Sequence, residues 1–166
     1  MSTSTRPVGR SPLLSNPRAS ERVETNVVTG IDPRGPQFTA ALTAVVLVLA
    51  LVLPTPVSIA LTAVQAAFFT IGAVRGVQRT PHAWLFRQIV RPRLAPPASL
   101  EDPRPPRFAQ GVGLAFTVVA LAAYAVGLSP LALVALGLAL VAAVLNAVFR
   151  FCLGCEFYLL IQRMTH

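Results

Sequence analysis

Lysine is absent from the 166-residue chain, and charge of either sign is scarce. Charged residues make up 12% of the sequence and aromatic residues 7%, whereas 54% are hydrophobic. A soluble domain of this size carries about twice that charged fraction, so the composition disfavours a soluble globular fold. The apolar residues form continuous stretches and do not alternate with polar ones, which disfavours a membrane β-barrel and favours membrane-spanning helices.

Four apolar stretches approach the length of about 20 helical residues that crosses the hydrocarbon core of a bilayer. They cover residues 38–53, 57–74, 108–128 and 131–149. Proline occurs between the first two stretches and again between the last two, and it cannot donate a backbone hydrogen bond, so both sites predict turns. Residues 30–163 are therefore predicted to be an all-α membrane domain, in which four transmembrane helices form two tandem helical hairpins.

All fourteen positively charged residues are arginines, and none lies in either predicted turn. They lie in residues 1–37, 75–107 and 150–163. Because positive residues favour the cytoplasmic side, we expect a multi-pass protein of the cell membrane with both termini and the central loop in the cytoplasm. The arginines flank apolar spans, which indicates topology and anionic-lipid contact and not nucleic-acid binding. Residues 1–29, rich in Ser, Pro and Arg, are predicted to be a disordered cytoplasmic segment.

The central loop contains a segment, residues 81–90, that could form about two turns of an interfacial helix. We expect Trp84 and Phe86 to lie at the level of the lipid headgroups, with Arg87 and Arg91 reaching the phosphates. Beyond this helix, residues 93–107 are rich in proline and are expected to be extended.

The same pattern, Asp-Pro-Arg-x-Pro-x-Phe, precedes both predicted hairpins, at residues 32–38 and 102–108. A tandem duplication is one explanation. The alternative is that any helix entering a membrane from the cytoplasm favours an acid, proline and arginine before it.

Cys152 and Cys155 are the only cysteines, and a bend at Gly154 would allow a disulfide between them. Their spacing favours a redox pair for thiol–disulfide or persulfide exchange, with Arg150 and Glu156 tuning the thiols. The alternative is that they are small apolar residues packed at a helix end. Because the fourth span ends here, its C-terminal dipole opposes a thiolate, and we expect the thiolate to be favoured only modestly. A cytoplasmic disulfide would be labile.

No metal site or cofactor is predicted. Besides the cysteines, the candidate ligands are His82, His166, Asp102 and Glu156, and none has a paired spacing. The apolar stretches contain no ionisable residue of the kind that ion transporters usually need. Their polar residues predict hydrogen bonds along a helix-packing seam or a path for a small solute. The alternative function is therefore a structural or solute-conducting membrane module.

From Ile31 to about Arg163 the chain resembles a bacterial integral membrane family named domain of unknown function 4395. The resemblance is carried by residues 31–34, 91–94 and 100–110, by Asn146 and, most distinctively, by Phe-Cys-Leu-Gly-Cys-Glu at residues 151–156. It implies a four-helix membrane domain. Members are often described together with thioredoxin-like proteins and sulfurtransferases, which implies a cytoplasmic partner of one of these kinds. The resemblance brings no activity with it.

Overall fold

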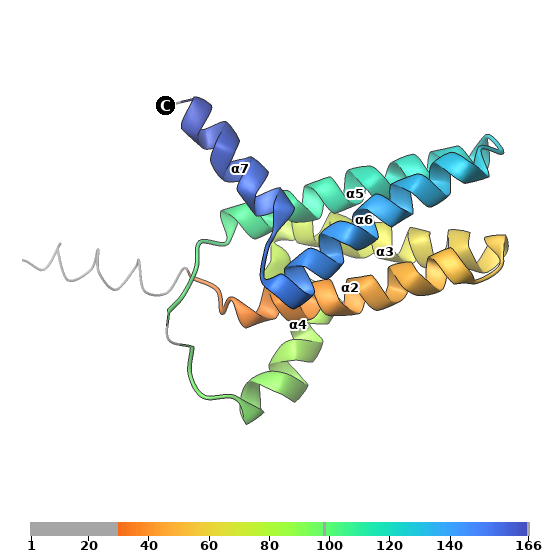
Figure 1. Cartoon of the computed structure of the whole chain (residues 1–166). Helices are drawn as coiled ribbons and strands as arrows, with labels where there is room; N and C mark the ends of the chain where they lie inside the picture. Colours follow the sequence, from red (N-terminus) through yellow and green to blue (C-terminus); the bar gives the residue numbers. More distant parts are fainter. Residues whose placement is uncertain (1–29, 98, 166) are drawn as a thin grey trace, which may run out of the picture. The chain divides into compact units, whose positions relative to one another are not determined.

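The four apolar stretches form four long helices in the computed structural model, which describes residues 30–97 and 99–165. The helices are α2 (Arg34–Val52), α3 (Thr55–Arg75), α5 (Arg104–Ala125) and α6 (Ser129–Phe149) (Figure 1). Each has 19 to 22 residues, apolar enough and long enough to cross a membrane at 1.5 Å per residue. The predicted all-α fold with four transmembrane helices is confirmed. The predicted disorder of residues 1–29 lies outside the described residues.

Two of these helices begin four residues before the apolar stretches that predicted them. The carboxylate of Asp32 accepts a hydrogen bond from the backbone N–H of Arg34 at 3.0 Å, and Asp102 does the same for Arg104 at 2.8 Å. Such bonds satisfy a donor that a helix start leaves free, so the polar residues 34–37 and 104–107 join the helices. The expectation that residues 93–107 are extended is therefore wrong for the segment from Arg104 onward.

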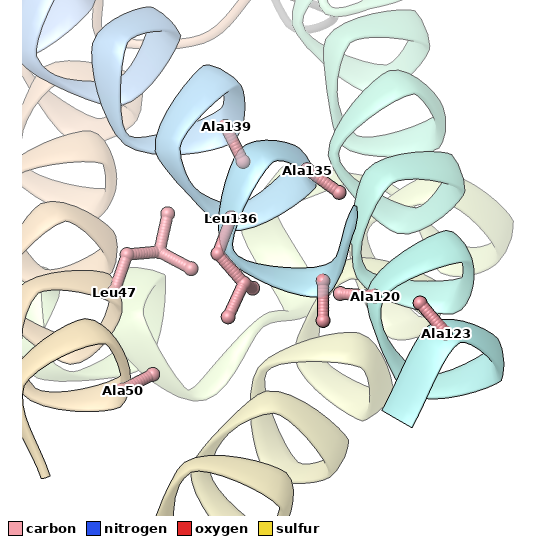
Figure 2. Packing of buried hydrophobic residues seen from close by; sticks show 8 residues of the cluster. Leu47, Ala50, Ala120, Ala123, Ala135, Leu136 and Ala139 are labelled. Atoms are coloured by element: carbon pink, nitrogen blue, oxygen red, sulfur yellow. The ribbon is translucent and has the colours of Figure 1, made fainter. Parts of the chain in front are cut away.

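The four long helices pack in a ring in which α2 and α5 each contact both α3 and α6. Alanines dominate the buried core, and small side chains let helix backbones approach closely where lipid supplies no hydrophobic driving force. The core cluster consists of Leu47, Ala50, Ala120, Ala123, Ala132, Ala135, Leu136 and Ala139 (Figure 2). Many valine and leucine side chains remain exposed on the outer surface, which suits a bundle surrounded by hydrocarbon.

Polar side chains inside the bundle make the interhelical hydrogen bonds that the sequence predicts. The hydroxyls of Ser58 and Tyr124 lie 3.0 Å apart, between α3 and α5. The side-chain amide of Gln65 donates to the hydroxyl of Thr43 at 3.3 Å, between α3 and α2. The polar residues of α3 therefore join the two helices of the first hairpin and tie this hairpin to the second.

A short helical segment follows α3 where the sequence predicts an interfacial helix. It consists of α4 (Pro81–Leu85), a π-helical turn η3 (Phe86–Val90) and a 3-10 turn η4 (Arg91–Arg93), preceded by a 3-10 turn η2 (Val77–Arg79). Trp84 is 56% exposed, and Arg87 and Arg91 are exposed too. Phe86 is only 4% exposed, because its ring packs on Phe38 of α2 with the centroids 5.6 Å apart. The expectation that Phe86 lies among headgroups is therefore wrong.

A further helix, α7 (Leu153–Met164), follows α6. Figure 1 shows α4 and α7 toward one end of the bundle and the two proline-containing turns at the other end. The helix α4 packs on α2, and α7 packs on α5. Each half of the described chain thus has the same order: a long helix, a turn, a second long helix, and a short helix that returns to the first.

Matching contacts show how closely the two halves repeat. Ile31 and Glu101, the residues before the two capping aspartates, form an antiparallel backbone bridge to each other, with N···O distances of 2.9 and 3.0 Å. The Phe38–Phe86 ring pair of the first half has a counterpart in Phe108 and Tyr158 of the second, at 5.7 Å. These pairs dock α4 and α7 on the bundle in the same way.

Phe38 and Phe108 are each preceded by a polar residue that covers the carboxyl end of a helix from the other half. Gln37 donates to the carbonyl of Ala147 in α6 at 2.9 Å. Arg107 donates to the carbonyls of Ala73 and Val74 in α3, each at 2.6 Å. Because the last carbonyls of a helix lack partners within it, these bonds stabilise both helix ends and clamp the halves together. The repeated sequence pattern thus corresponds to a repeated structure.

Candidate functional site

The cysteine pair lies where the chain turns from α6 into α7. Helix α6 ends at Phe149, and Arg150 adopts a left-handed backbone conformation with φ 57° and ψ 22°. The N–H of Phe151 then bonds to the carbonyl of Leu145 at 3.2 Å, which closes the helix end. After this sharp turn only Cys152 separates Phe151 from Leu153, where α7 begins.

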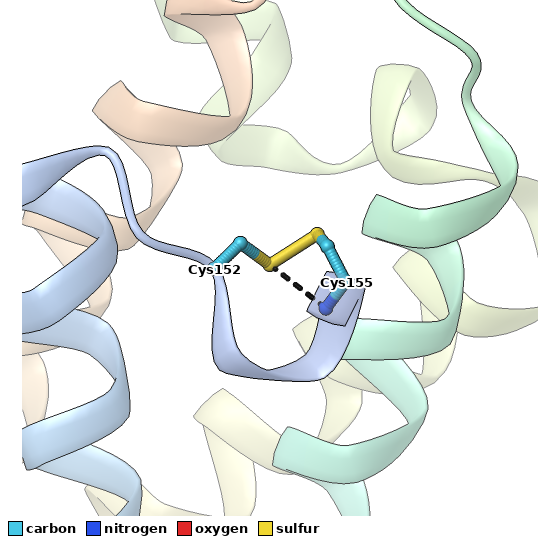
Figure 3. Close-up of a disulfide and its surroundings, with 2 residues drawn as sticks. All are labelled: Cys152 and Cys155. Atoms are coloured by element: carbon cyan, nitrogen blue, oxygen red, sulfur yellow. Dashed lines mark hydrogen bonds between the residues drawn. A yellow bond between two sulfur atoms is a disulfide. The ribbon is translucent and has the colours of Figure 1, made fainter. Parts of the chain in front are cut away.

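Cys152 is the N-cap residue of α7, and Cys155 lies in its first turn. The two sulfurs form a disulfide, with Cα atoms 5.2 Å apart. The backbone N–H of Cys155 donates to the sulfur of Cys152 at 3.3 Å, shown by the dashed line in Figure 3. Both side chains are half-buried, so a reaction partner can reach them.

This placement overturns the expectation that a helix C-terminus opposes the thiolate. The N-terminus of α7 presents unpaired N–H groups and the positive end of the helix dipole to Cys152. Both favour the charged form of a thiol. The sequence signal that was missed is the seven-residue spacing of Glu156 and Arg163 around apolar residues, which puts both charges on one face of an amphipathic helix.

Gly154 fixes the pair against α5. It is buried, and a Cβ atom added to it would lie 2.7 Å from both the Cα and the Cβ of Ala109. Real side chains do not approach so closely, so only glycine allows this contact between α7 and α5. The bend predicted at Gly154 is therefore a close approach of two backbones within a helix turn.

A cavity of about 720 Å³ adjoins the cysteines. Its polar lining below the cysteine turn comes from α2, α5 and α6, and it reaches Thr43, in the middle of α2. The polar residues that line it below the cysteine turn are Gln37, Thr39, Thr43, Gln110 and Asn146. The apolar lining includes the rings of Phe69 and Phe116. The cavity therefore connects the disulfide with the interior of the helix bundle.

The predicted tuning residues share this site. Arg150 and Glu156 are exposed, and both line the cavity beside Cys152 and Cys155. Glu156 in the first turn of α7 complements the helix dipole, whereas Arg150 places a positive charge near the thiols. The structure thus brings together all four residues predicted to act in exchange.

The residues predicted to contact lipid form a separate surface. Trp84, Arg87 and Arg91 lie on α4, η3 and η4, and none of them lines the cavity.

Sequence reasoning missed Gln37 and Gln110 as cavity residues, because nothing in their own segments distinguishes them from ordinary polar residues at a membrane surface. Within residues 30–97 and 99–165, no group of three or more His, Cys, Asp or Glu residues is placed to hold a metal ion.

His82 is buried on α4 and meets the ring of Phe68 edge-on, with centroids 5.0 Å apart. Burial lowers the pKa of His82 below its ordinary value, since a charged imidazole loses hydration there. In the repeat, His82 and Gly154 each stand two residues after the residue that caps the short helix. His82 therefore helps to dock α4 on the bundle, as Gly154 helps to dock α7.

The chain belongs to the family described as domain of unknown function 4395, whose model matches residues 31–163. The resemblance found from the sequence is thereby confirmed over the whole helix bundle and nearly all of α7. No curated protein and no solved structure matches the chain.

Proposed function

We propose that this membrane protein exchanges disulfides, through Cys152 and Cys155, with a thioredoxin-like or sulfurtransferase partner in the cytoplasm. The observation that carries the proposal is the position of Cys152. Its sulfur caps α7 and accepts the N–H of Cys155, while both side chains stay half-exposed. A purely structural pair has no need of a helix N-terminus or of solvent access, whereas a reactive pair needs both.

The exchange proceeds through a mixed disulfide. A thiolate of the partner attacks the sulfur of Cys152, the bond to Cys155 breaks, and the sulfur of Cys155 leaves with the electron pair and takes a proton. The partner's second thiolate then attacks the mixed disulfide, which leaves the partner oxidised and the cysteine pair reduced. The same steps run in reverse when the thiolate of Cys152, stabilised at the helix N-terminus, attacks a partner's disulfide.

A sulfurtransferase partner would bring a persulfide in place of a dithiol. The thiolate of Cys152 would take the outer sulfur of that persulfide and release the partner's thiolate. Cys155 would then attack the inner sulfur, which re-forms the disulfide and releases hydrogen sulfide. Both routes use Cys152 as the residue that makes the first bond.

The cytoplasmic orientation of the cysteines is part of the proposal, and it rests on the positions of the arginines. Each long helix has arginine at or next to the end that is remote from the proline turn. These arginines lie at the same end of the bundle as the cysteines. They are Arg34, Arg75, Arg104, Arg107 and Arg150. Positive residues remain on the cytoplasmic side of a cell membrane, so the disulfide would face a reducing compartment and be labile.

Contact with anionic lipid at the same face is also proposed. Trp84 presents an exposed aromatic ring, and Arg87 and Arg91 extend from the same short helical segment. Aromatic rings favour the headgroup region, and arginines there bind lipid phosphates. The opposite face of the segment is covered by its contacts with α2.

A trapping experiment tests the exchange. In a Cys155→Ser variant the mixed disulfide on Cys152 cannot be resolved from within the protein, so we expect partner proteins to remain attached through a reducible bond and to be identified by mass spectrometry. The matched Cys152→Ser variant keeps one thiol at nearly the same place and should trap far less. Equal trapping by the two variants, or none by either, would contradict the proposed roles.

A further inference from the structure

Small side chains of α6 line the cavity beside the disulfide. Helices α3 and α6 are both 21 residues long. Counted from their starts, Gln65 and Phe69 of α3 correspond to Ala139 and Ala143 of α6. Both alanines line the cavity, and Phe69 lines it too, whereas Gln65 does not. The small side chains of α6 thus leave room in the space that Phe69 also borders.

The cavity also reaches the outer surface of the bundle. Leu138 and Val141 of α6 line it, and they are 53% and 55% exposed. In a membrane-spanning helix such side chains face hydrocarbon. A molecule dissolved in the lipid can therefore reach the cavity at the outer face of α6 without passing through water.

The lining suits a flat ring that bears carbonyl groups. Phe69 and Phe116 offer apolar ring faces, and aromatic side chains pack well on flat rings. The side-chain amides of Gln110 and Asn146 donate no hydrogen bond to another residue in the part of the chain that the structure describes, so they are available to carbonyl oxygens of a ligand. The lining residues from α2, α5 and α6 below the cysteine turn carry no ionisable group other than Arg34 at the start of α2.

We propose that the cavity binds a lipid-soluble quinone, which takes two electrons from the reduced Cys152–Cys155 pair. This inference rests on the proposed thiol–disulfide exchange. Both cysteines line the cavity, so a ring inside it lies beside the sulfurs. The two S–H bonds break and one S–S bond forms. Two electrons and two protons pass to the carbonyl oxygens of the quinone, which becomes a hydroquinone. The partner's reducing equivalents thus reach the membrane carrier pool.

The test uses the full chain in lipid nanodiscs, reduced with dithiothreitol and freed from the excess. The probe is a benzoquinone with all ring positions substituted and a decyl tail, because such a ring cannot be alkylated by thiols. Hydroquinone formation is followed by absorbance, and remaining thiols are counted with a maleimide. We expect one hydroquinone for every two thiols lost, and none from a variant in which both cysteines are serine.

Two phenylalanine variants locate the reaction. Ala143→Phe fills the cavity opposite Thr43 and should slow quinone reduction about tenfold or more, since a phenyl ring overpacks the space that the quinone needs. Val148→Phe adds the same ring to the exposed outer face of α6, away from the cavity lining, and should leave the rate unchanged. Exchange with dithiothreitol shows for each variant that the pair is folded and reactive.

The outcomes separate the inference from the function on which it depends. Exchange with dithiothreitol but no hydroquinone overturns the quinone site and leaves thiol exchange standing. A lack of both reactions in the wild type overturns the proposed function itself. Hydroquinone formed equally fast by the two phenylalanine variants places the reaction outside the cavity and also overturns the quinone site.

Discussion

The two halves of the molecule share a scaffold and differ in what fills it. In each, a short helix returns to the first long helix, and its N-cap residue accepts a hydrogen bond from the N–H three residues later. The first half uses the hydroxyl of Thr80, which accepts from Ala83 at 3.2 Å, and the second uses the sulfur of Cys152. The cap is thus a hydroxyl in one half and, in the proposed function, a reactive sulfur in the other.

The same contrast holds inside the bundle. Gln65 and Phe69 of α3 occupy the positions that Ala139 and Ala143 occupy in α6, and the two alanines line the cavity beside the disulfide. The proposed site therefore lies where the smaller side chains and the cysteines come together.

The largest effect is expected from moving the cysteine pair between the halves. A variant with both native cysteines replaced by serine, combined with Thr80→Cys and Ala83→Cys, should form a disulfide, because the caps have the same geometry. It should nevertheless reduce quinone at a rate near zero, since neither Thr80 nor Ala83 lines the cavity. Diamide oxidation followed by maleimide counting checks the disulfide, and hydroquinone absorbance checks the transfer. Rapid transfer from the moved pair would show that the cavity is irrelevant.

Gly154→Ala should disturb the cysteine turn strongly. The added methyl group meets Ala109 at 2.7 Å, and such overpacking typically costs about 1–3 kcal/mol. Helix α7 should shift away from α5, so the reduced thiols should react faster with a maleimide and the midpoint of thermal unfolding should fall. Gly111→Ala in α5 is the matched control, because a Cβ atom there meets no heavy atom within 4 Å. Similar behaviour of the two variants would contradict the close contact.

The amino-acid sequence predicts the hairpins well and the site only in part. Proline turns and unbroken apolar runs are local signals, and they located four spans whose ends needed correction by a few residues. The helix α7 was missed because Glu156, Gln162 and Arg163 interrupt its apolar residues, as they do in any segment at a membrane surface.

Properties that depend on packing between distant segments were not predictable. Phe86 is buried only because α4 packs on α2, and the cavity exists only because Ala139 and Ala143 face helices remote in sequence. The position of Cys152 at a helix N-terminus also depends on α7, whose amphipathic pattern a search for long apolar runs overlooks. The residues of the site were identifiable from the sequence, whereas their electrostatic environment was not.

A weaker effect is expected for lipid contact, which should involve the segment that contains α4 and not α7. Trp84 is the only tryptophan, so its fluorescence reports on the first half alone. We expect brominated anionic lipids to quench it more than brominated neutral lipids, and Arg87→Gln with Arg91→Gln to remove the difference, since each basic residue near a charged surface contributes about 1 kcal/mol. Arg163→Gln on α7 is the control and should change nothing. A preference that survives the double substitution would show that these arginines only set topology.

The smallest effect concerns pH and His82. Burial lowers the pKa of His82 in the folded protein below its ordinary value, so the unfolded chain binds a proton more readily than the folded one. Docking of α4 is therefore fully stable above the ordinary histidine pKa and weakens as the pH falls below it, until the lowered pKa is passed. Gly154 takes the corresponding place in α7 and does not titrate. The emission maximum of Trp84, two residues from His82, should shift as the pH falls through this window, and His82→Phe should abolish the shift. A shift that persists in His82→Phe would mean that another group controls the docking of α4.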